Sequence, residues 1–327
     1  MKPVAITLGD PAGIGPEVAA QVVANARGPT DEPWILVGPR WALDIGAEAA
    51  GVNLPEIPDH RPGSASSISL VDIDVPKPAD FVFGQIQVAC GRAAVASVEW
   101  AAQGCLSGDL AAMVTCPLNK EAIHAAGFVD DLGHQEILAR LSGVEWTATM
   151  LMTPGLKVAH LSTHKSLIEA ARYVRRETIL NKLQLINHTV KQWGIETPRI
   201  AVAALNPHGG EGGLLGREEI EEVAPAVEDA IGQGILAQGP IPADSIFNRA
   251  IAGEFDVVLA LYHDQGHIAI KVHNFHESTT ATLGIPFVRT SVDHGTAFDI
   301  AGQGRANPQG LRSAIDTAQN IVTGSLS

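Results

Sequence analysis

Two apolar runs in the last third of the chain each lead into a dense cluster of polar side chains. Residues 257–261 precede the cluster 262–267, and residues 284–288 precede the cluster 289–297. A short apolar run without alternation is typical of a strand buried on both faces of a parallel sheet. Polar residues after such a strand lie at its carboxyl end, where open α/β sheets bind ligands. The alternative, ordinary surface loops, explains less well why imidazole, carboxylate, amide and guanidinium groups recur so closely.

The same succession of strand, polar turn and helix recurs along the chain. We expect strands at 4–8, 34–37, 110–114, 156–161 and 199–205. We expect helices at 18–24, 92–106 and 137–141, two more between 167 and 193, an acidic one at 218–231 with a solvated face, and a short one after 242–245. Residues 51–79, rich in Pro, Ser and Gly, should be irregular. This order predicts a mostly parallel sheet with helices on both faces.

Length, charge and cysteine content narrow the class of protein. A chain of 327 residues exceeds what one core usually holds, so two domains or lobes are expected. The net charge of -14, without a basic run, argues against nucleic acid as a partner. No apolar stretch is long enough for a membrane span, and three cysteines without metal-site spacing indicate buried thiols in a reducing compartment. We therefore expect a cytoplasmic protein that binds neither nucleic acid nor membrane.

The turn after the first strand could bind an anion. Its glycines permit a tight turn, and Pro16 suits the first turn of a helix, whose free amides favour an anion. The turn is neither a P-loop nor a G-x-G-x-x-G motif, so a plain strand-to-helix turn is an equal alternative. Lys120, after residues 110–114, is either a solvated charge or a group that projects into a cleft.

Three histidines each follow a predicted strand directly. They are His164, His208 and His263. Neutral imidazoles at one edge of a sheet, with a fourth position open, would make a catalytic divalent metal site. A single histidine after a strand is more often a loop residue with hydrogen-bond partners than a metal ligand, and it is the group of three that favours a metal site. His267, like its neighbours His273 and His276, is interpreted as part of a polar face in one strand-loop segment.

Six motifs together resemble the 4-hydroxythreonine-4-phosphate dehydrogenase family over nearly the whole chain. They are GDPAGIGPE at 9–17, CPLNK at 116–120, LNPH at 205–208, PAD at 242–244, YHDQG at 262–266 and RTSVDHGTA at 289–297. The resemblance implies a two-lobed α/β/α fold, related to isocitrate and isopropylmalate dehydrogenases, without the Rossmann glycine motif. It also implies pyridoxine biosynthesis and a homodimer whose active site takes residues from both subunits. We place one lobe at 1–130 with 280–327 and the other at 131–279, with the site in the cleft between them.

The resemblance also assigns roles to individual residues. The implied metal ligands are His164, His208 and His263. The implied substrate contacts are His134, Gln135, Asp244, Lys271, Thr280 and Arg289, and from these we take Asp244 and Lys271 as candidate catalytic groups. We expect cofactor contacts from Gly9, Asp10, Asn206, Asp293 and His294. The expected cofactors are NAD, with NADP as the alternative, and a divalent metal: zinc first, then cobalt, manganese or magnesium.

The implied reaction is oxidation of a secondary alcohol beta to a carboxylate, followed by loss of carbon dioxide. Lys271 and Arg289 suit a carboxylate or phosphate, while Asp244 could accept a proton or cap a helix. This chain has Gln135 and Thr280 where the biosynthetic pattern resembles G-H-T-E and V-N-x-T-L-G. Both departures fall at substrate positions, so the substrate is 4-phosphohydroxythreonine or a related threonate or erythronate phosphate. The alternatives are a non-phosphorylated carboxylated diol, or a non-catalytic homologue that binds metal and ligand.

Overall fold

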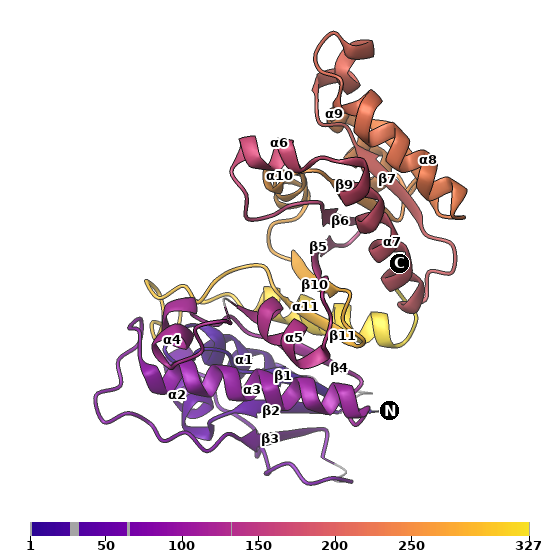
Figure 1. Cartoon of the computed structure of the whole chain (residues 1–327). Coiled ribbons are helices and arrows are strands. Elements are labelled where there is room, and N and C mark those ends of the chain that lie inside the picture. Colours follow the sequence, from indigo (N-terminus) through magenta and orange to yellow (C-terminus); the bar gives the residue numbers. More distant parts are fainter. Residues whose placement is uncertain (1, 27–32, 64–65, 132, 327) are drawn as a thin grey trace. The chain divides into compact units, whose positions relative to one another are not determined.

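The chain divides into two compact units in the computed structural model, which describes residues 2–26, 33–63, 66–131 and 133–326. Unit 1 comprises Met1–Thr147 and Ile285–Val322, and unit 2 comprises Ala148–Gly284 and Thr323–Ser327 (Figure 1). These boundaries differ from the expected 130/131 and 279/280. Helix α5 (His134–Ser142) lies in unit 1 because it packs against helix α3 (Val88–Ser107) there.

Unit 1 is built on a parallel sheet with the strand order β3-β2-β1-β4-β11. Its strands are β1 (Val4–Thr7), β2 (Trp34–Gly38), β3 (Ile68–Asp72), β4 (Ala112–Thr115) and β11 (Val288–Val292). Its other helices are α1 (Gly15–Ala24), α2 (Arg40–Ala50), α4 (Lys120–Ala125) and α11 (Gln309–Val322). Alternate residues of β1 enter two different cores: Ile6 packs with α1, α2 and α11, and Ala5 packs with α3 and α5. Helices therefore cover both faces of this sheet.

Unit 2 has the strand order β10-β5-β6-β9-β7-β8, and β5 runs antiparallel to both of its neighbours. Its strands are β5 (Ala148–Thr153), β6 (Leu156–His160), β7 (Arg199–Ala203), β8 (Leu236–Ile241), β9 (Val257–Ala260) and β10 (Thr279–Leu283). Its helices are α6 (Leu167–Tyr173), α7 (Arg176–Gln192), α8 (Ala224–Gly232), α9 (Ala243–Ile251) and α10 (His263–His273), with a short turn η1 (Pro207–Gly213) and a π-helical turn η2 (Glu219–Val223). Residues of α9 and α10 share a core with β6, β7 and β9.

Both strand orders confirm the predicted mostly parallel α/β fold. The three cysteines, Cys90, Cys105 and Cys116, are free and buried, and burial raises the pKa of each thiol to about 12. In the described parts of the chain, no helix combines the length and the apolar character that a bilayer crossing requires.

Four local predictions were wrong. The strand expected at 284–288 is β11, which begins only at Val288, so Arg289 lies inside a strand rather than after one. The segment with His267, His273 and His276, predicted to be strand and loop, is helix α10 as far as His273. The stretch 51–79, predicted to be irregular, contains β3. The acidic segment 218–231 is not simply a wet face, because it begins as a π-helical turn in which Glu219 is buried.

Candidate functional site

The three predicted metal ligands follow three neighbouring strands of unit 2. His164 comes after β6, His263 begins α10 directly after β9, and His208 follows β7. Strands β6 and β7 both pair in parallel with β9, so the three carboxyl ends lie at one edge of the sheet. The side chains of His164 and His208 are exposed. The fold of one chain thus brings the three histidines to the same edge.

The described residues of a single chain do not complete a metal centre. Within residues 2–26, 33–63, 66–131 and 133–326, no group of three His, Cys, Asp or Glu side chains is close enough to hold an ion. One ring nitrogen of His263 is engaged by a carboxylate, as is common for metal-binding histidines: Nδ1 lies 2.7 Å from Oδ1 of Asp264. When Nδ1 carries the proton, this contact leaves Nε2 of His263 with a free lone pair.

His208 belongs to an unusual stretch of left-handed backbone. Residues 208–212 all have positive φ, and two of them, His208 at 52° and Glu211 at 47°, are not glycine. Each non-glycine residue in this region costs roughly 1–2 kcal/mol. A conformation of this kind persists only where surrounding contacts enforce it.

Glu219 supplies those contacts from the π-helical turn η2. Its Oε1 accepts hydrogen bonds from the backbone N–H groups of Leu205 (2.9 Å) and Asn206 (2.6 Å), and its Oε2 accepts one from Nδ2 of Asn206 (2.9 Å). Nδ2 of Asn206 also donates to Glu218, at 2.7 Å. The side-chain NH2 group of Asn206, a residue predicted to contact the cofactor, therefore donates to Glu218 and Glu219 and stabilises the loop that carries His208.

A second group of predicted residues gathers in unit 1 where α5 begins. Arg289 of β11 is 5% exposed and directs Nε (3.1 Å) and Nη2 (2.5 Å) at Oγ1 of Thr115, the last residue of β4. Burial lowers the pKa of Arg289 to about 9. Burial, and then the nearby charge of Arg289, hold the pKa of His134 well below its usual value.

The beginning of α5 is suited to an anion. His134 and the half-buried Gln135 occupy its first two positions, where backbone N–H groups are unpaired by the helix itself. Nε2 of His134 is buried and has no hydrogen-bond partner in the structure. A neutral imidazole with an unused nitrogen, beside a buried guanidinium, matches a phosphate or carboxylate oxygen that accepts from both.

The turn after β1 is shaped by close backbone packing. Gly9 has φ +69°, and a Cβ on it would lie 2.2 Å from the carbonyl oxygen of Pro117. Asp10 is fully buried; its Oδ1 accepts from the N–H of Ala12 at 2.8 Å, whereas its Oδ2 has no partner. Burial raises the pKa of Asp10 to about 6. The structure thus gives both predicted cofactor residues a role in the shape of this turn.

The remaining predicted site residues lie on separate elements: Lys271 on α10, Thr280 in β10, Asp244 on α9, and Asp293 and His294 after β11. Lys271 lies on α10, with Nζ 4.9 Å from the ring centroid of Phe275, and the half-buried Thr280 lies in β10. Asp244 is exposed in the first turn of α9. The N-cap there is Pro242, without a side-chain cap, so the capping role considered for Asp244 is wrong. Asp293 and His294 follow β11, and Nδ1 of His294 lies 3.0 Å from the carbonyl oxygen of Gly295.

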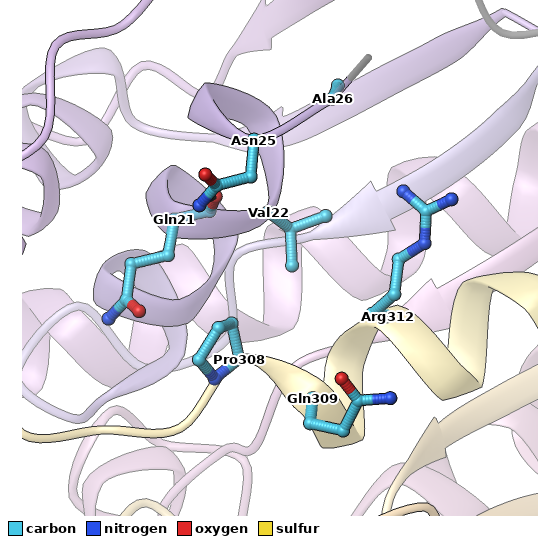
Figure 2. A pocket seen from close by; sticks show the side chains of 7 residues that line it. All are labelled: Gln21, Val22, Asn25, Ala26, Pro308, Gln309 and Arg312. Carbon is cyan, nitrogen blue, oxygen red and sulfur yellow. Dashed lines mark hydrogen bonds between the residues drawn. The ribbon is translucent and has the colours of Figure 1, made fainter.

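A cavity of about 450 Å³ between α1 and α11 does not belong to these groups. Figure 2 shows its lining, with Gln21 on α1, Asn25 directly after that helix, and Gln309 and Arg312 on α11. It contains none of the predicted site residues. Side chains from two helices line it, and the strand ends that carry the candidate ligands do not reach it.

His267 is the residue of the site that sequence reasoning missed. Its ring stacks on that of His263, with centroids 3.5 Å apart and planes 11° from parallel. The spacing of His263, His267 and Lys271 at four-residue intervals, typical of one helix face, was the available signal. It was overlooked because the segment was interpreted as strand and loop.

Comparisons with known proteins give a consistent result. The family described as "Pyridoxal phosphate biosynthetic protein PdxA" matches residues 30–318. The D-threonate 4-phosphate dehydrogenase of Pectobacterium atrosepticum is 38% identical over 327 residues, covering 98% of this chain and 99% of that protein.

Two solved structures resemble the fold. A 4-hydroxythreonine-4-phosphate dehydrogenase from Klebsiella pneumoniae superposes with a TM-score of 0.88 at 38% identity, covering 98% of this chain and 100% of that chain. A terephthalate 1,2-cis-dihydrodiol dehydrogenase from Burkholderia xenovorans gives a TM-score of 0.68 at 29% identity, covering 100% of this chain and 99% of that chain.

Proposed function

Because this chain belongs to the PdxA family of dehydrogenases, we propose that it oxidises D-threonate 4-phosphate or its erythronate epimer in preference to 4-phosphohydroxythreonine. Threonate carries a hydroxyl where hydroxythreonine carries an ammonium group, so the two differ in what they donate and accept. The observation that carries the proposal is Gln135, at the second position of α5 next to His134. Its side-chain amide both donates and accepts, as a hydroxyl partner requires.

Arg289, His134 and Lys271 are the proposed partners of the anionic groups of the substrate. Arg289, buried and fixed on Thr115, offers a planar fork for a phosphate or carboxylate, and His134 adds an unused ring nitrogen. Lys271 offers a point charge from α10. The net charge of -14 does not prevent binding of an anionic substrate, because a few cationic side chains are enough to make a pocket locally positive.

In the proposed reaction, the hydroxyl proton passes to a base and the carbinol hydrogen leaves as hydride to NAD or NADP. The product is a β-keto acid, which loses carbon dioxide as its carboxylate C–C bond breaks. Asp244 and Lys271 are the proposed proton acceptor and donor, because both project from the helices that follow the sheet edge of unit 2. A bound nicotinamide would supply the hydride acceptor, and a divalent cation held by the histidines would stabilise negative charge on the oxygen of the alcohol whose carbon is oxidised.

The donor chemistry of unit 2 fits such a cation. His164, His208 and His263 are imidazoles at one sheet edge, and Asp264 holds Nδ1 of His263 so that Nε2 is the ligand atom. Three such donors with an open position suit zinc, cobalt or manganese. The described residues of one chain bring these histidines to one edge but not within reach of a single ion, so we propose that a second chain completes the site.

The proposal of a homodimer draws on exposed apolar side chains of α6 and α10, the helices that follow β6 and β9. Leu167 and Ile168 at the start of α6 are both 67% exposed, and Val272 on α10 is 83% exposed. Large exposed apolar groups of this kind mark interaction surfaces. They lie on the helices that begin just after His164 and at His263.

The substrate is tested by NADH formation at 340 nm, with threonate, erythronate and hydroxythreonine phosphates beside a non-phosphorylated carboxylated diol. We expect the two sugar-acid phosphates to give the highest kcat/KM, and the Gln135→Thr, Thr280→Asn double variant to shift the ratio towards hydroxythreonine phosphate. Two mismatched hydrogen bonds at about 1–3 kcal/mol each correspond to roughly ten- to ten-thousand-fold. A parent enzyme that already favours hydroxythreonine phosphate, or a double variant with an unchanged ratio, would refute the assignment.

The shared site is tested by mixing two inactive variants. His164→Ala and His263→Ala chains should each lack turnover, whereas a mixed dimer regains one complete histidine set if the set spans two chains. Recovery of activity after subunit exchange is the expected result. Exchange demonstrated by mass spectrometry without recovery would place the three histidines in one chain or remove their role.

A further inference from the structure

We infer that His267 is a positioning residue that fixes the ring of His263 for metal binding. The inference rests on the proposed metal site, and it concerns a residue with no assigned role. His263 is the first residue of α10 and its side chain is 43% exposed, so few neighbours limit its rotation. His267 lies one helical turn further on, on the same face.

The contact between the two rings is extensive. Their centroids are 3.5 Å apart and their planes are 11° from parallel, so the whole face of one imidazole covers the other. At the edge of the His263 ring, Nδ1 lies 2.7 Å from Oδ1 of Asp264. With its face against His267 and its Nδ1 against Asp264, the His263 ring is fixed in orientation, and so is the direction in which Nε2 points. That is what a metal ligand requires, because the position of Nε2 decides the bond.

His267 is itself held by the interior of unit 2. Its Nδ1 lies 3.1 Å from Nε2 of His160 and 3.0 Å from the backbone carbonyl oxygen of His263. Both are acceptors when neutral His160 carries its proton on Nδ1, and one N–H of His267 is then shared between them. His160 is the last residue of the buried strand β6 and is only 2% exposed. The arrangement therefore connects a rigid strand, through His267, to the exposed His263.

Gly266 makes this arrangement possible. A Cβ at residue 266 would lie 2.3 Å from Nε2 of His160 and 2.8 Å from Cγ1 of Val158. Any side chain there would push the His160 ring away from α10. The neighbouring Gln265 ties the helix start to the sheet, because it accepts from the N–H of Leu261 and donates to the carbonyl oxygen of Ala204, both at 2.7 Å.

Plain packing would not need this geometry. A Leu at position 267 could fill the same space against β6, but it offers neither a flat face for His263 nor an N–H for His160. The consequence of a positioning role is specific: loss of the ring should weaken metal binding while the fold remains. Removing a residue that orients a metal ligand typically weakens affinity about 10- to 100-fold.

The test is a cobalt(II) titration of the full-length protein, followed by the visible absorption of bound cobalt. His267→Leu should bind cobalt about 10- to 100-fold more weakly and with an altered spectrum. His267→Phe keeps a flat ring and should lie closer to the parent than the Leu variant does. His273→Leu is the matched control, since His273 lies on the same helix with Nε2 on the carbonyl oxygen of Pro154 instead. It should match the parent.

Thermal unfolding of each variant separates loss of fold from loss of metal. Cobalt binding by His267→Leu that equals the parent in affinity and spectrum overturns the inference. So does a His267→Phe variant that loses cobalt as completely as His263→Ala, because His267 would then act as a ligand. If His263→Ala itself binds cobalt normally, the proposed metal site fails, and this outcome is distinct from failure of the positioning role alone.

Discussion

Replacement of Glu219 by Gln should destabilise unit 2 and loosen the loop that carries His208. Glu219 is 2% exposed and accepts three hydrogen bonds, two from the backbone N–H groups of Leu205 and Asn206 and one from Nδ2 of Asn206. Gln keeps one oxygen, which can still accept from the backbone. Its NH2 group would face Nδ2 of Asn206, donor against donor.

The magnitude follows from the hydrogen bond that is lost. A buried hydrogen bond to a charged acceptor contributes about 1.5–3 kcal/mol, so the variant should lose roughly 2–3 kcal/mol of unfolding free energy. Glu221→Gln is the matched control. It makes the same exchange two residues away, at a side chain that is 57% exposed and paired with Arg217. A surface pair of this kind contributes about 0.3–0.5 kcal/mol.

Two measurements check the expectation. Urea unfolding followed by circular dichroism should show a lower midpoint for Glu219→Gln than for Glu221→Gln. Hydrogen exchange in a peptide covering residues 204–213 should be faster in the first variant, because the N–H groups of Leu205 and Asn206 lose part of their acceptor. Equal midpoints and equal exchange in the two variants would show that Glu219 does not hold this loop.

Three further outcomes are expected. Gly9→Ala should prevent stable folding, because its Cβ would lie 2.2 Å from the carbonyl oxygen of Pro117. Gly51 has a similar φ but open space around it, so Gly51→Ala should lower the free energy of unfolding by only about 1 kcal/mol, as a thermal melt would show. Burial raises the pKa of Asp10 from 3.8 to about 6, so the folded state binds this proton more tightly and stability falls as pH rises from about 4 to 6. Asp10→Asn should remove this pH dependence. The difference in unfolding free energy between the variant and the parent should therefore rise by about 3 kcal/mol in favour of the variant from pH 4 to pH 7, which urea unfolding at both pH values would measure. Arg289→Lys should raise KM for the phosphorylated substrate about tenfold or more in steady-state assays, because an ammonium group cannot reproduce the buried planar fork.

The order of strands and helices could be predicted because apolar runs and turn residues recur regularly. The polar strand β11 could not. Arg289, Thr290 and Ser291 are buried there because each finds a partner, on the hydroxyl of Thr115, the carbonyl of Ala314 and the carbonyl of Thr115. Hydropathy depends on the side chain and not on its hydrogen-bond partner, so it predicts a strand at the apolar segment just before β11.

The candidate site shows the same limit. That His164, His208 and His263 follow strands could be predicted, since an apolar run ends before each of them. Their placement after adjacent strands depends on the strand order of unit 2, which no local pattern contains. The importance of Glu219 depends on a π-helical turn, which leaves no periodic signal in the sequence. For His267, the four-residue spacing from His263 indicates a shared helix face, but no sequence pattern shows that the two rings stack.

The interleaving of the two units along the chain sets an order of events during synthesis. Strand β11 pairs with β4, and α11 contributes Leu311, Ala314 and Ile315 to the core of unit 1. On the ribosome these pieces emerge only after the whole inserted segment 148–284 has been made. The nascent N-terminal portion therefore waits with an open sheet edge and an uncovered apolar face while the inserted unit completes its sheet. Chaperone dependence of this protein should accordingly concentrate on its first 147 residues, and a circular permutant that makes residues 285–322 first should shorten that exposure.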